Sequence, residues 1–290
     1  MPGAGASRQK TPRETRQARN SRRPDTSEEP AIAFRVGCFM RQSPRSPARL
    51  PALAALAADF DGTLAQDGQV GSSVVDSLSS LRSAGLRAFL VTGRELEDLR
   101  SVFDRLDLFD AVVAENGAVL FFPSTGATRV IAPPPPPALV ELLRASEVIP
   151  LFVGRSCIST RATQEPLVLR AVRELGLDWC VVRNNTSLMC LPRGVDKASG
   201  LRAILDEIGL DPRRVVAIGD GENDACLFAA CGLGVAVANA CDDLKAEADL
   251  VTLEREGEGV SAFIRSWLST FPRPVALVEP GRGTKSRFAD

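Results

Sequence analysis

The sequence predicts an α/β fold with a doubly wound, Rossmann-like parallel sheet as its core and a small inserted α+β cap domain. Three observations lead to this prediction. Short apolar runs alternate with amphipathic stretches of helical length, as in doubly wound sheets. Several of these runs end in polar or acidic residues, and open α/β sheets bind ligands at the carboxyl ends of their strands. Between residues 119 and 192 the alternation gives way to short strands and helices in another order, which indicates an insertion.

The composition is that of a globular enzyme. The chain has 290 residues, 44% of them hydrophobic and 24% charged. No apolar run approaches the roughly 18 residues of a membrane span, so we expect no membrane segment. The seven cysteines contain no CxxC pair, which fits reduced thiols and predicts a cytoplasmic location.

Two absent residue types exclude several kinds of catalysis. The chain has no histidine, so Ser-His-Asp hydrolysis, Cys-His catalysis and HExxH zinc sites are excluded. It has no tyrosine either. Acid–base chemistry must therefore come from carboxylates, lysine or cysteine.

The first 50 residues differ from the rest in charge. They hold eleven Lys and Arg and four Asp and Glu, about +7, which leaves 24 basic and 32 acidic residues, −8, in the remainder. We expect residues 1–50 to be a disordered basic tail. It could be an organelle transit peptide, a nucleic-acid-binding arm or simply a solvated segment. The acidic remainder argues against nucleic-acid binding by the folded part.

Residues 51–118 are expected to form the first part of the core. The small apolar run from Leu53 to Ala58 predicts a buried strand. Val75, Leu78 and Leu81 follow at helical spacing, and Gly85 suits the helix end. The elements expected in this part after the first strand are a helix over 72–84, a strand over 86–91, a helix over 95–106 and a strand over 109–114.

Residues 119–192 are expected to form the cap. They open with an antiparallel hairpin, 119–122 with 128–131. The five-proline run from Pro133 to Pro137 predicts a stiff polyproline II segment, either a strut or hinge beside the cap or a rigid surface loop. The elements expected after it are helices over 138–145 and 164–175 and strands over 149–153, 157–160, 179–183 and 187–191.

Residues 193–271 are expected to return to the core, and residues 272–290 to form a C-terminal tail. Leu201, Ile204 and Leu205 lie on one face of the first predicted helix. The elements expected here are helices over 196–208, 225–230, 243–248 and 259–271 and strands over 215–218, 233–237 and 250–252.

Two carboxylates, Asp59 and Asp61, end the first predicted strand. A buried strand does not end in two such close negative charges unless something compensates for them. A divalent cation would do so, and carboxylate oxygens suit Mg²⁺. The sequence therefore predicts a metal-dependent site at the tip of this strand.

Other polar residues are expected at the same edge of the sheet. Thr92, Asp220 and Asp224 follow predicted strands, and Lys197 begins a predicted helix. Acids, a hydroxyl and a lysine at one edge meet the needs of phosphoryl transfer: a nucleophile, a metal site, donors for the phosphoryl oxygens and a proton donor.

At this point the chain resembles the haloacid dehalogenase superfamily of phosphohydrolases, in its Cof-like and sucrose-phosphate-phosphatase-like branch with an inserted C2-type cap. The resemblance covers about residues 52–271. Glu115-Asn116-Gly117-Ala118 also resembles that branch's entry to its cap. The four motifs are Asp59-Phe60-Asp61-Gly62-Thr63, Val91-Thr92-Gly93-Arg94, Gly194-Val195-Asp196-Lys197 and Gly219-Asp220-Gly221-Glu222-Asn223-Asp224.

The resemblance implies a role for each motif residue. Asp59 is the expected nucleophile and a metal ligand. Asp61 is the expected acid and base, with its backbone carbonyl on the metal. Thr92 and Lys197 are expected to hold the phosphoryl oxygens. The remaining expectations are Asp220 and Asp224 as metal ligands, and Gly62, Arg94, Asn116 and Asn223 at the substrate.

The expected function is that of a Mg²⁺-dependent phosphatase. It would hydrolyse a small phosphorylated metabolite, a sugar phosphate or a phospho-acid, through an aspartyl-phosphate. In the cap, Arg161, Asn184 and Asn185 are candidates for substrate contact. Two alternatives remain open: a phosphomutase of the same superfamily, and a regulatory or nucleic-acid-associated module with a vestigial site.

Overall fold

A computed structural model describes residues 39–41, 52–184 and 186–270. Asn185 and the expected C-terminal tail over 272–290 lie outside the described residues. So does the expected tail over 1–50, apart from one short strand.

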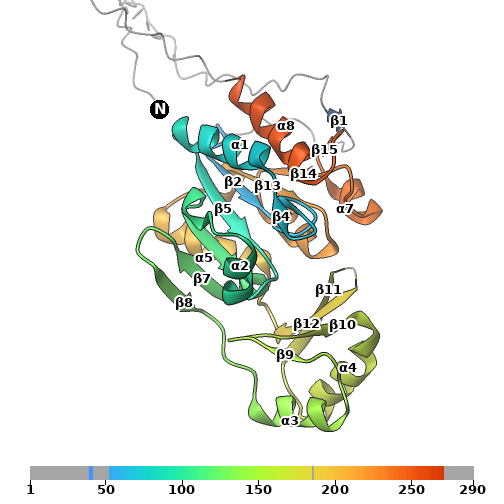
Figure 1. Ribbon diagram of the computed structural model, residues 1–290. Coiled ribbons are helices and arrows are strands. Elements are labelled where there is room, and N and C mark those ends of the chain that lie inside the picture. Colours follow the sequence, from blue (N-terminus) through green and yellow to red (C-terminus); the bar gives the residue numbers. More distant parts are fainter. Residues whose placement is uncertain (1–38, 42–51, 185, 271–290) are drawn as a thin grey trace, which may run out of the picture. The chain divides into compact units, whose positions relative to one another are not determined.

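The core is a nine-stranded sheet whose six central strands are parallel, which confirms the predicted fold class (Figure 1). One strand at one edge and two at the other run antiparallel to their neighbours. The order across the sheet is β1 (Phe39–Arg41), β15 (Leu250–Thr252), β14 (Leu233–Ala236), β13 (Val215–Gly219), β2 (Ala55–Ala58), β5 (Arg87–Val91), β6 (Ala111–Ala114), β7 (Val119–Phe122) and β8 (Ala127–Val130).

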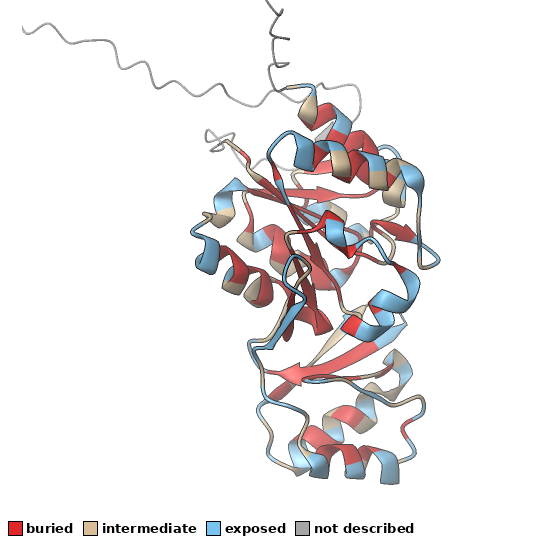
Figure 2. Ribbon diagram, turned by 60° about the vertical axis from the view of Figure 1, so that its left-hand side comes forward, coloured by how far each residue is buried: buried red, intermediate tan, exposed pale blue. Residues whose placement is uncertain are grey.

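The central strand β2 shows why these residues form this sheet. Its four residues are all buried, since neighbours flank it on both edges and helices cover the sheet on both faces (Figure 2). Continuous apolar runs are typical of such doubly covered strands. The helices pack in pairs, α1 (Ser72–Ser83) with α8 (Glu256–Leu268) and α5 (Lys197–Ile208) with α6 (Ala225–Ala230).

The hairpin of β7 and β8 belongs to the core sheet and not to the cap, so the expected domain boundary after residue 118 is wrong here. β7 pairs antiparallel with β6, and Val119 and Leu120 are completely buried in the main hydrophobic core. A short connection from β6 makes adjacent antiparallel pairing the simplest continuation of the sheet. The cap therefore begins after β8.

Three other local expectations differ from the structure. Phe39–Arg41 form the edge strand β1, although the tail over 1–50 was expected to be disordered. The helix expected over 95–106 ends early, as α2 (Leu96–Val102), because Phe103 is extended and its ring lies 5.8 Å from that of Phe60. The hairpin β3 (Ala65–Gln66) and β4 (Gln69–Val70) was missed, although Asp67-Gly68 is a strong hairpin-turn signal.

The cap is a four-stranded antiparallel sheet with two helices packed on one face. Its own hydrophobic cluster includes Leu143, Val168 and Leu188. The elements are α3 (Pro137–Ala145), β9 (Phe152–Val153), β10 (Ile158–Arg161), α4 (Glu165–Glu174), β11 (Trp179–Asn184) and β12 (Ser187–Pro192), in the sheet order β11-β12-β10-β9. The proline run is the link from β8 to α3, and Pro137 is already the first residue of that helix.

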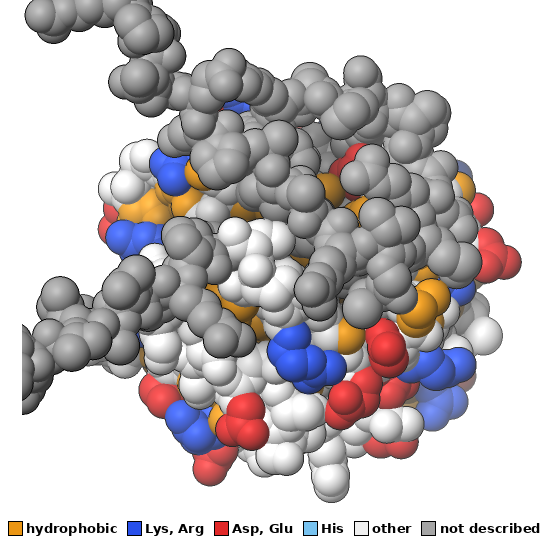
Figure 3. All heavy atoms as spheres, turned by 90° about the horizontal axis from the view of Figure 1, so that it is seen from above, with side chains coloured by type: hydrophobic (Ala, Val, Ile, Leu, Met, Phe, Trp, Pro, Cys, Tyr) orange, Lys and Arg blue, Asp and Glu red, His pale blue; other side chains and the backbone are white. Residues whose placement is uncertain are grey.

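None of the helices in the described ranges is both long enough and apolar enough to cross a membrane. On the face shown in Figure 3, the basic and acidic side chains that are visible lie interspersed, and neither sign gathers in a large patch.

Candidate active site

A buried lysine joins two buried carboxylates at the centre of the site. Lys197 Nζ donates hydrogen bonds to Asp59 Oδ1 at 2.6 Å and to Asp224 Oδ1 at 2.7 Å. The side chains of Lys197 and Asp224 are fully buried, and that of Asp59 is 3% exposed. Such groups are stable in the interior only when paired. The three residues therefore act as one electrostatic unit.

The start of α5 holds Lys197 in this place. Asp196 caps the helix by accepting a hydrogen bond from the backbone N–H of Ser199, whose hydroxyl is hydrogen-bonded to the Asp196 backbone in return. Gly200 lets the helix lie close to the backbone of Gly117, where a side chain would collide. This close packing brings the first helical residue, Lys197, to the strand tips.

Asp220 lies on the other side of Asp59 and shapes the loop after β2. Thr63 Oγ1 donates to Asp220 Oδ1 at 3.0 Å. Gly62 has φ +74°, and a Cβ there would collide with the carboxylate of Asp220. Asn239 donates its side-chain N–H to the carbonyl of Gly62 at 2.7 Å. Thr63 and Asn239 were not predicted as supports of this loop, because no local pattern indicates a contact between residues 62 and 239.

Asp61 is paired with Arg94. The guanidinium binds both carboxylate oxygens, with Nε 2.6 Å from Oδ2 and Nη2 2.8 Å from Oδ1. Its remaining Nη1 donates to Asp98 at 2.6 Å, and the hydrogen bond to Asp61 raises the pKa of Arg94 above its usual range. A forked pair of this kind fixes direction as well as charge. Arg94, expected at the substrate, thus orients the carboxylate of Asp61.

Three polar, uncharged motif residues, Thr92, Asn116 and Asn223, are buried. Thr92 follows β5, and its hydroxyl accepts the backbone N–H of Arg94 at 3.1 Å. Asn223 donates to Asn116 Oδ1 at 3.3 Å, while Asn223 Oδ1 has no partner in the described structure. Asn116 has φ +52°, a left-handed conformation that asparagine tolerates better than most residues.

The packing of acids raises two pKa values. Burial, and then the charge of Asp224, raise the pKa of Asp59 well above its ordinary range, although Lys197 opposes this. The same two causes, in the same order, raise the pKa of Asp220 to about 6. For Lys197, burial alone would lower the pKa, but the charges of Asp224 and Asp59 together raise it above its ordinary value. The single positive charge of Lys197 therefore does not offset the effects of burial and of the neighbouring acids on the pKa values of Asp59 and Asp220.

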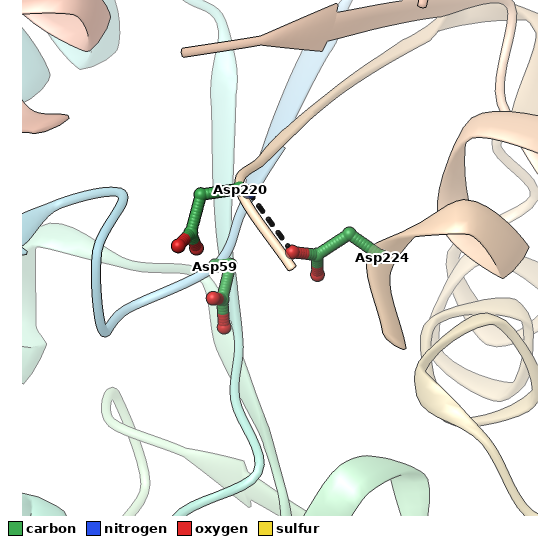
Figure 4. Close-up of side chains that lie close together, drawn as sticks. All are labelled: Asp59, Asp220 and Asp224. Atoms are coloured by element: carbon green, nitrogen blue, oxygen red, sulfur yellow. Dashed lines mark hydrogen bonds between the residues drawn. The ribbon is translucent and has the colours of Figure 1, made fainter. Parts of the chain in front are cut away.

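These carboxylates fit a divalent cation. One oxygen each of Asp59, Asp220 and Asp224 lies within 4.8 Å of the others (Figure 4). Asp59 Oδ2 is buried and accepts no hydrogen bond in the described structure. Asp224 is fixed by the backbone N–H groups of Asp220, at 3.1 Å, and Gly221, at 3.0 Å. An all-oxygen, acidic set of donors is the chemistry that Mg²⁺ requires.

A cavity of about 630 Å³ is lined by predicted catalytic residues of the core and by residues of the cap. Asp59, Asp61 and Thr92 line its core side, and Arg161 and Asn184, both predicted as substrate contacts, line its cap side. A larger cavity of about 880 Å³ lies at the β3–β4 hairpin and the start of α8, but none of the predicted site residues lines it. The predicted site residues therefore line the smaller cavity and not the larger one.

Glu115 attaches the cap to the core beside this cavity, a role that the sequence analysis missed. Its side chain is 1% exposed and accepts the backbone N–H groups of Arg155 at 3.1 Å and Ser156 at 2.8 Å, both in the cap. The Arg155 guanidinium binds Glu97 of α2 at 2.6 Å. Glu115 directly precedes Asn116, so the cap is fixed at the edge of the active site.

Replacing Glu115 by Gln should destabilise this attachment. The Gln amide carries a donor where Glu115 has an acceptor, so one buried N–H of the cap loop loses its partner at a cost of about 1–3 kcal/mol. We expect the melting temperature to fall by about 2–10 °C. Glu141→Gln, on the exposed surface of α3, is the control. Equal melting temperatures for the two variants would contradict the role given to Glu115.

Known sequences are similar to this chain over most of its length. A family model described as haloacid dehalogenase-like hydrolase matches residues 56–131 and 171–264. A phosphoglycolate phosphatase of Methanopyrus kandleri is 32% identical over 229 residues, which are 72% of this chain and 95% of the relative. A phosphoglycolate phosphatase of Halorubrum lacusprofundi is 31% identical over 220 residues, 72% of this chain and 95% of the relative.

Solved structures show the same fold. A sugar phosphatase of haloacid dehalogenase subclass IIB superposes with a TM-score of 0.62 at 21% identity, over 75% of this chain and all of the other. A haloacid dehalogenase-like hydrolase from Bacteroides thetaiotaomicron superposes with a TM-score of 0.63 at 22% identity, over 73% of this chain and 98% of the other.

Proposed function

Because the chain belongs to the haloacid dehalogenase-like hydrolases, we propose that it is a Mg²⁺-dependent phosphatase that forms an aspartyl-phosphate on Asp59. The chain is a phosphoric monoester hydrolase, and the relatives above carry the name phosphoglycolate phosphatase. One observation carries the finer proposal. Asp59 is held through Oδ1 by Lys197, while its buried Oδ2 has no partner in the described structure and the residue lines the cavity.

In the first half of the proposed reaction, a carboxylate oxygen of Asp59 attacks phosphorus. The bond from phosphorus to the ester oxygen of the substrate breaks, and Asp61 donates its proton to that leaving oxygen. Arg94 binds both oxygens of Asp61 in this structure, so one of these hydrogen bonds must open when Asp61 carries the proton that it donates. Thr92, which lines the same cavity as Asp59, and Lys197, whose Nζ lies 2.6 Å from Asp59 Oδ1, provide donors for the phosphoryl oxygens.

In the second half, water attacks phosphorus and Asp61, now a carboxylate, takes its proton. The bond between phosphorus and Asp59 breaks, and inorganic phosphate and the Asp59 carboxylate are released. Gly62 allows the backbone to come close to the phosphate, and Asn223 lines the cavity and donates a hydrogen bond to Asn116. A separate acid and base are not needed, because the proton that Asp61 gives in the first half returns in the second.

The residues that would hold Mg²⁺ are Asp59, Asp220 and Asp224, with the backbone carbonyl of Asp61. When bound, the cation would neutralise the negative charge that the phosphoryl group and the carboxylates bring together. Its binding is supported by the raised pKa values of Asp59 and Asp220, which are caused first by burial and then by the negative charge of Asp224.

The proposed substrate is a small phosphorylated metabolite. The cavity of about 630 Å³ must contain the phosphate and the rest of the molecule. The names of the relatives favour a phospho-acid over a sugar phosphate. We also propose a cytoplasmic location, which the six free cysteines of the described residues support.

Phosphate release from a panel of sugar phosphates and phospho-acids, with and without Mg²⁺, tests this function. We expect turnover that depends on Mg²⁺ and is greatest on a phospho-acid. A phosphomutase would instead convert one phosphate ester to another without net phosphate release. Absence of release from every member, or release unaffected by removal of divalent cations, would contradict the proposal.

Mg²⁺ should also stabilise the fold, and the effect should depend on pH. At about 100 times its dissociation constant the cation adds about 2.7 kcal/mol, or roughly 5–10 °C. A carboxyl group whose pKa is raised by folding favours the folded state at low pH, and that contribution is lost as pH rises. Metal binding needs the deprotonated form. Between pH 7.5 and pH 5, through the pKa of about 6 of Asp220, we therefore expect the gain from Mg²⁺ to shrink.

Melting temperatures at pH 7.5, 6 and 5, each with Mg²⁺ and with a chelator, measure this effect. Asp220→Asn is the matched variant, because it removes one proposed ligand without a change of shape. A gain from Mg²⁺ that is the same at all three pH values would contradict the proposed ligands.

A further inference from the structure

The cap sheet presents one of its two faces to the catalytic residues. In β10, Ile158 belongs to the cap's own hydrophobic cluster. Because side chains alternate along a strand, Ser159 and Arg161 lie on the opposite face of the cap sheet. Ser159 pairs in register with Met189 of β12, and Arg161 with Ser187. Met189 belongs to the core cluster and lies against Gly93, directly after Thr92. Arg161 is thus on the face that looks onto the active site.

Arg161 is the available cation of the cavity. Arg94 and Arg161 are the two basic residues that line it. Arg94 is already occupied by Asp61 and Asp98. Arg161 is exposed and has no carboxylate partner among the described residues. The cavity therefore has a free guanidinium on the side opposite Asp59.

The charges around the cavity decide what this guanidinium can bind. Besides Asp59 and Asp61, the core side carries Glu95 and Asp98, so a second anionic group of the substrate would be repelled there. A neutral substrate would offer Arg161 no anionic partner in the cavity. A carboxylate matches the guanidinium fork, and the neighbouring hydroxyl of Ser187 offers another donor.

We propose that Arg161 is the specificity-determining residue that binds a carboxylate of the substrate, so that the enzyme acts on small phosphorylated carboxylic acids. This rests on the proposed phosphatase function and assigns the leaving group to a named residue of the cap. The phosphate lies at Asp59 and the carboxylate points to β10. A sugar phosphate without an acidic group lacks this contact.

Two esters of nearly equal size test the proposal: 2-phosphoglycolate and 2-hydroxyethyl phosphate, which has a hydroxymethyl group in place of the carboxylate. The wild type should prefer 2-phosphoglycolate in kcat/KM. In Arg161→Gln the ratio of the two kcat/KM values should fall by about 10–100-fold, the effect of a lost charged hydrogen bond. Arg161→Lys keeps the positive charge but loses the forked pair of donors, so its ratio of kcat/KM values should lie between those of the wild type and Arg161→Gln. Most of the loss should appear in KM for 2-phosphoglycolate.

Arg144→Gln is the matched control, because Arg144 is exposed on α3 and outside the cavity. An unchanged ratio in Arg161→Gln, or an equal loss on both esters, would overturn the proposal while the phosphatase function stands. A preference for ethylene glycol bisphosphate that Arg161→Gln abolishes would overturn the choice of a carboxylate. No phosphate release by the wild type from any ester would instead refute the proposed function itself.

Discussion

Asp59→Asn should abolish phosphatase activity, lowering kcat by at least about four orders of magnitude, because an amide cannot form the phosphorylated intermediate. The substitution should not unfold the protein. The Asn side-chain oxygen can still accept the hydrogen bond from Lys197 Nζ, which lies 2.6 Å from Oδ1. The substitution also removes the negative charge at position 59, where burial and the charges of Asp224 and Asp220 raise the pKa of the carboxyl group. We therefore expect the metal-free melting temperature to stay the same or rise.

Steady-state kinetics and melting curves of Asp59→Asn, with and without Mg²⁺, measure both effects. Asp104→Asn, on the exposed surface after α2, is the control for the chemical change. The stabilisation by Mg²⁺ should decrease in Asp59→Asn and persist in Asp104→Asn. Activity within about tenfold of the wild type would exclude Asp59 as the nucleophile.

Lys197→Met should cause the largest loss of stability. Methionine has nearly the same length but no charge, so Asp59 and Asp224 would lose the cation that binds both. Removing one partner of a buried ion pair costs about 3–5 kcal/mol. This corresponds to about 6–20 °C in melting temperature. Activity should fall by about 10³-fold or more, because a donor for the phosphoryl oxygens is also lost.

The pH dependence separates this electrostatic effect from a packing effect. Without Lys197, protonation of the carboxylates relieves their repulsion, so the stability deficit should shrink between pH 7.5 and pH 5. A deficit caused by poor packing would not change in this way. Lys197 and Lys245 are the two lysines between residues 52 and 270, and Lys245→Met, on α7 (Asp242–Glu247), is the control. If Lys197→Met were as stable as Lys245→Met, Lys197 would not be the residue that stabilises the buried carboxylates.

Much of the fold and of the catalytic centre could be predicted because both depend on local signals. Apolar runs of strand length place β2, β5 and β13, and the topology of parallel strands brings their tips to one edge. Asp59, Lys197 and Asp224 were predicted at that edge and lie within hydrogen-bonding distance there. Charge compensation predicted that the acids need a cation, and the unpartnered oxygen of Asp59 supports this.

The interactions that could not be predicted are those between distant segments that share no periodic pattern. The fork of Arg94 on Asp61 depends on the angle between two strand tips, which residue types alone do not determine. Glu115 reads as a polar strand end until the cap loop, forty residues later, brings two N–H groups to it. The β7–β8 hairpin joins the core sheet because β6 has a free edge on which β7 can pair, and the sequence does not show this.

The central claim is that phosphate is transferred to Asp59, and chemical trapping tests it most directly. Because Asp61 acts in both halves of the reaction, the wild type is the suitable protein for this test. It would be mixed with 2-phosphoglycolate and Mg²⁺, quenched rapidly during turnover and treated with borohydride, which reduces an acyl phosphate to an alcohol. Mass spectrometry should then find homoserine at position 59 in samples that received substrate and in no others. Substrate-dependent conversion of another carboxylate, or turnover with an unmodified Asp59, would contradict the account.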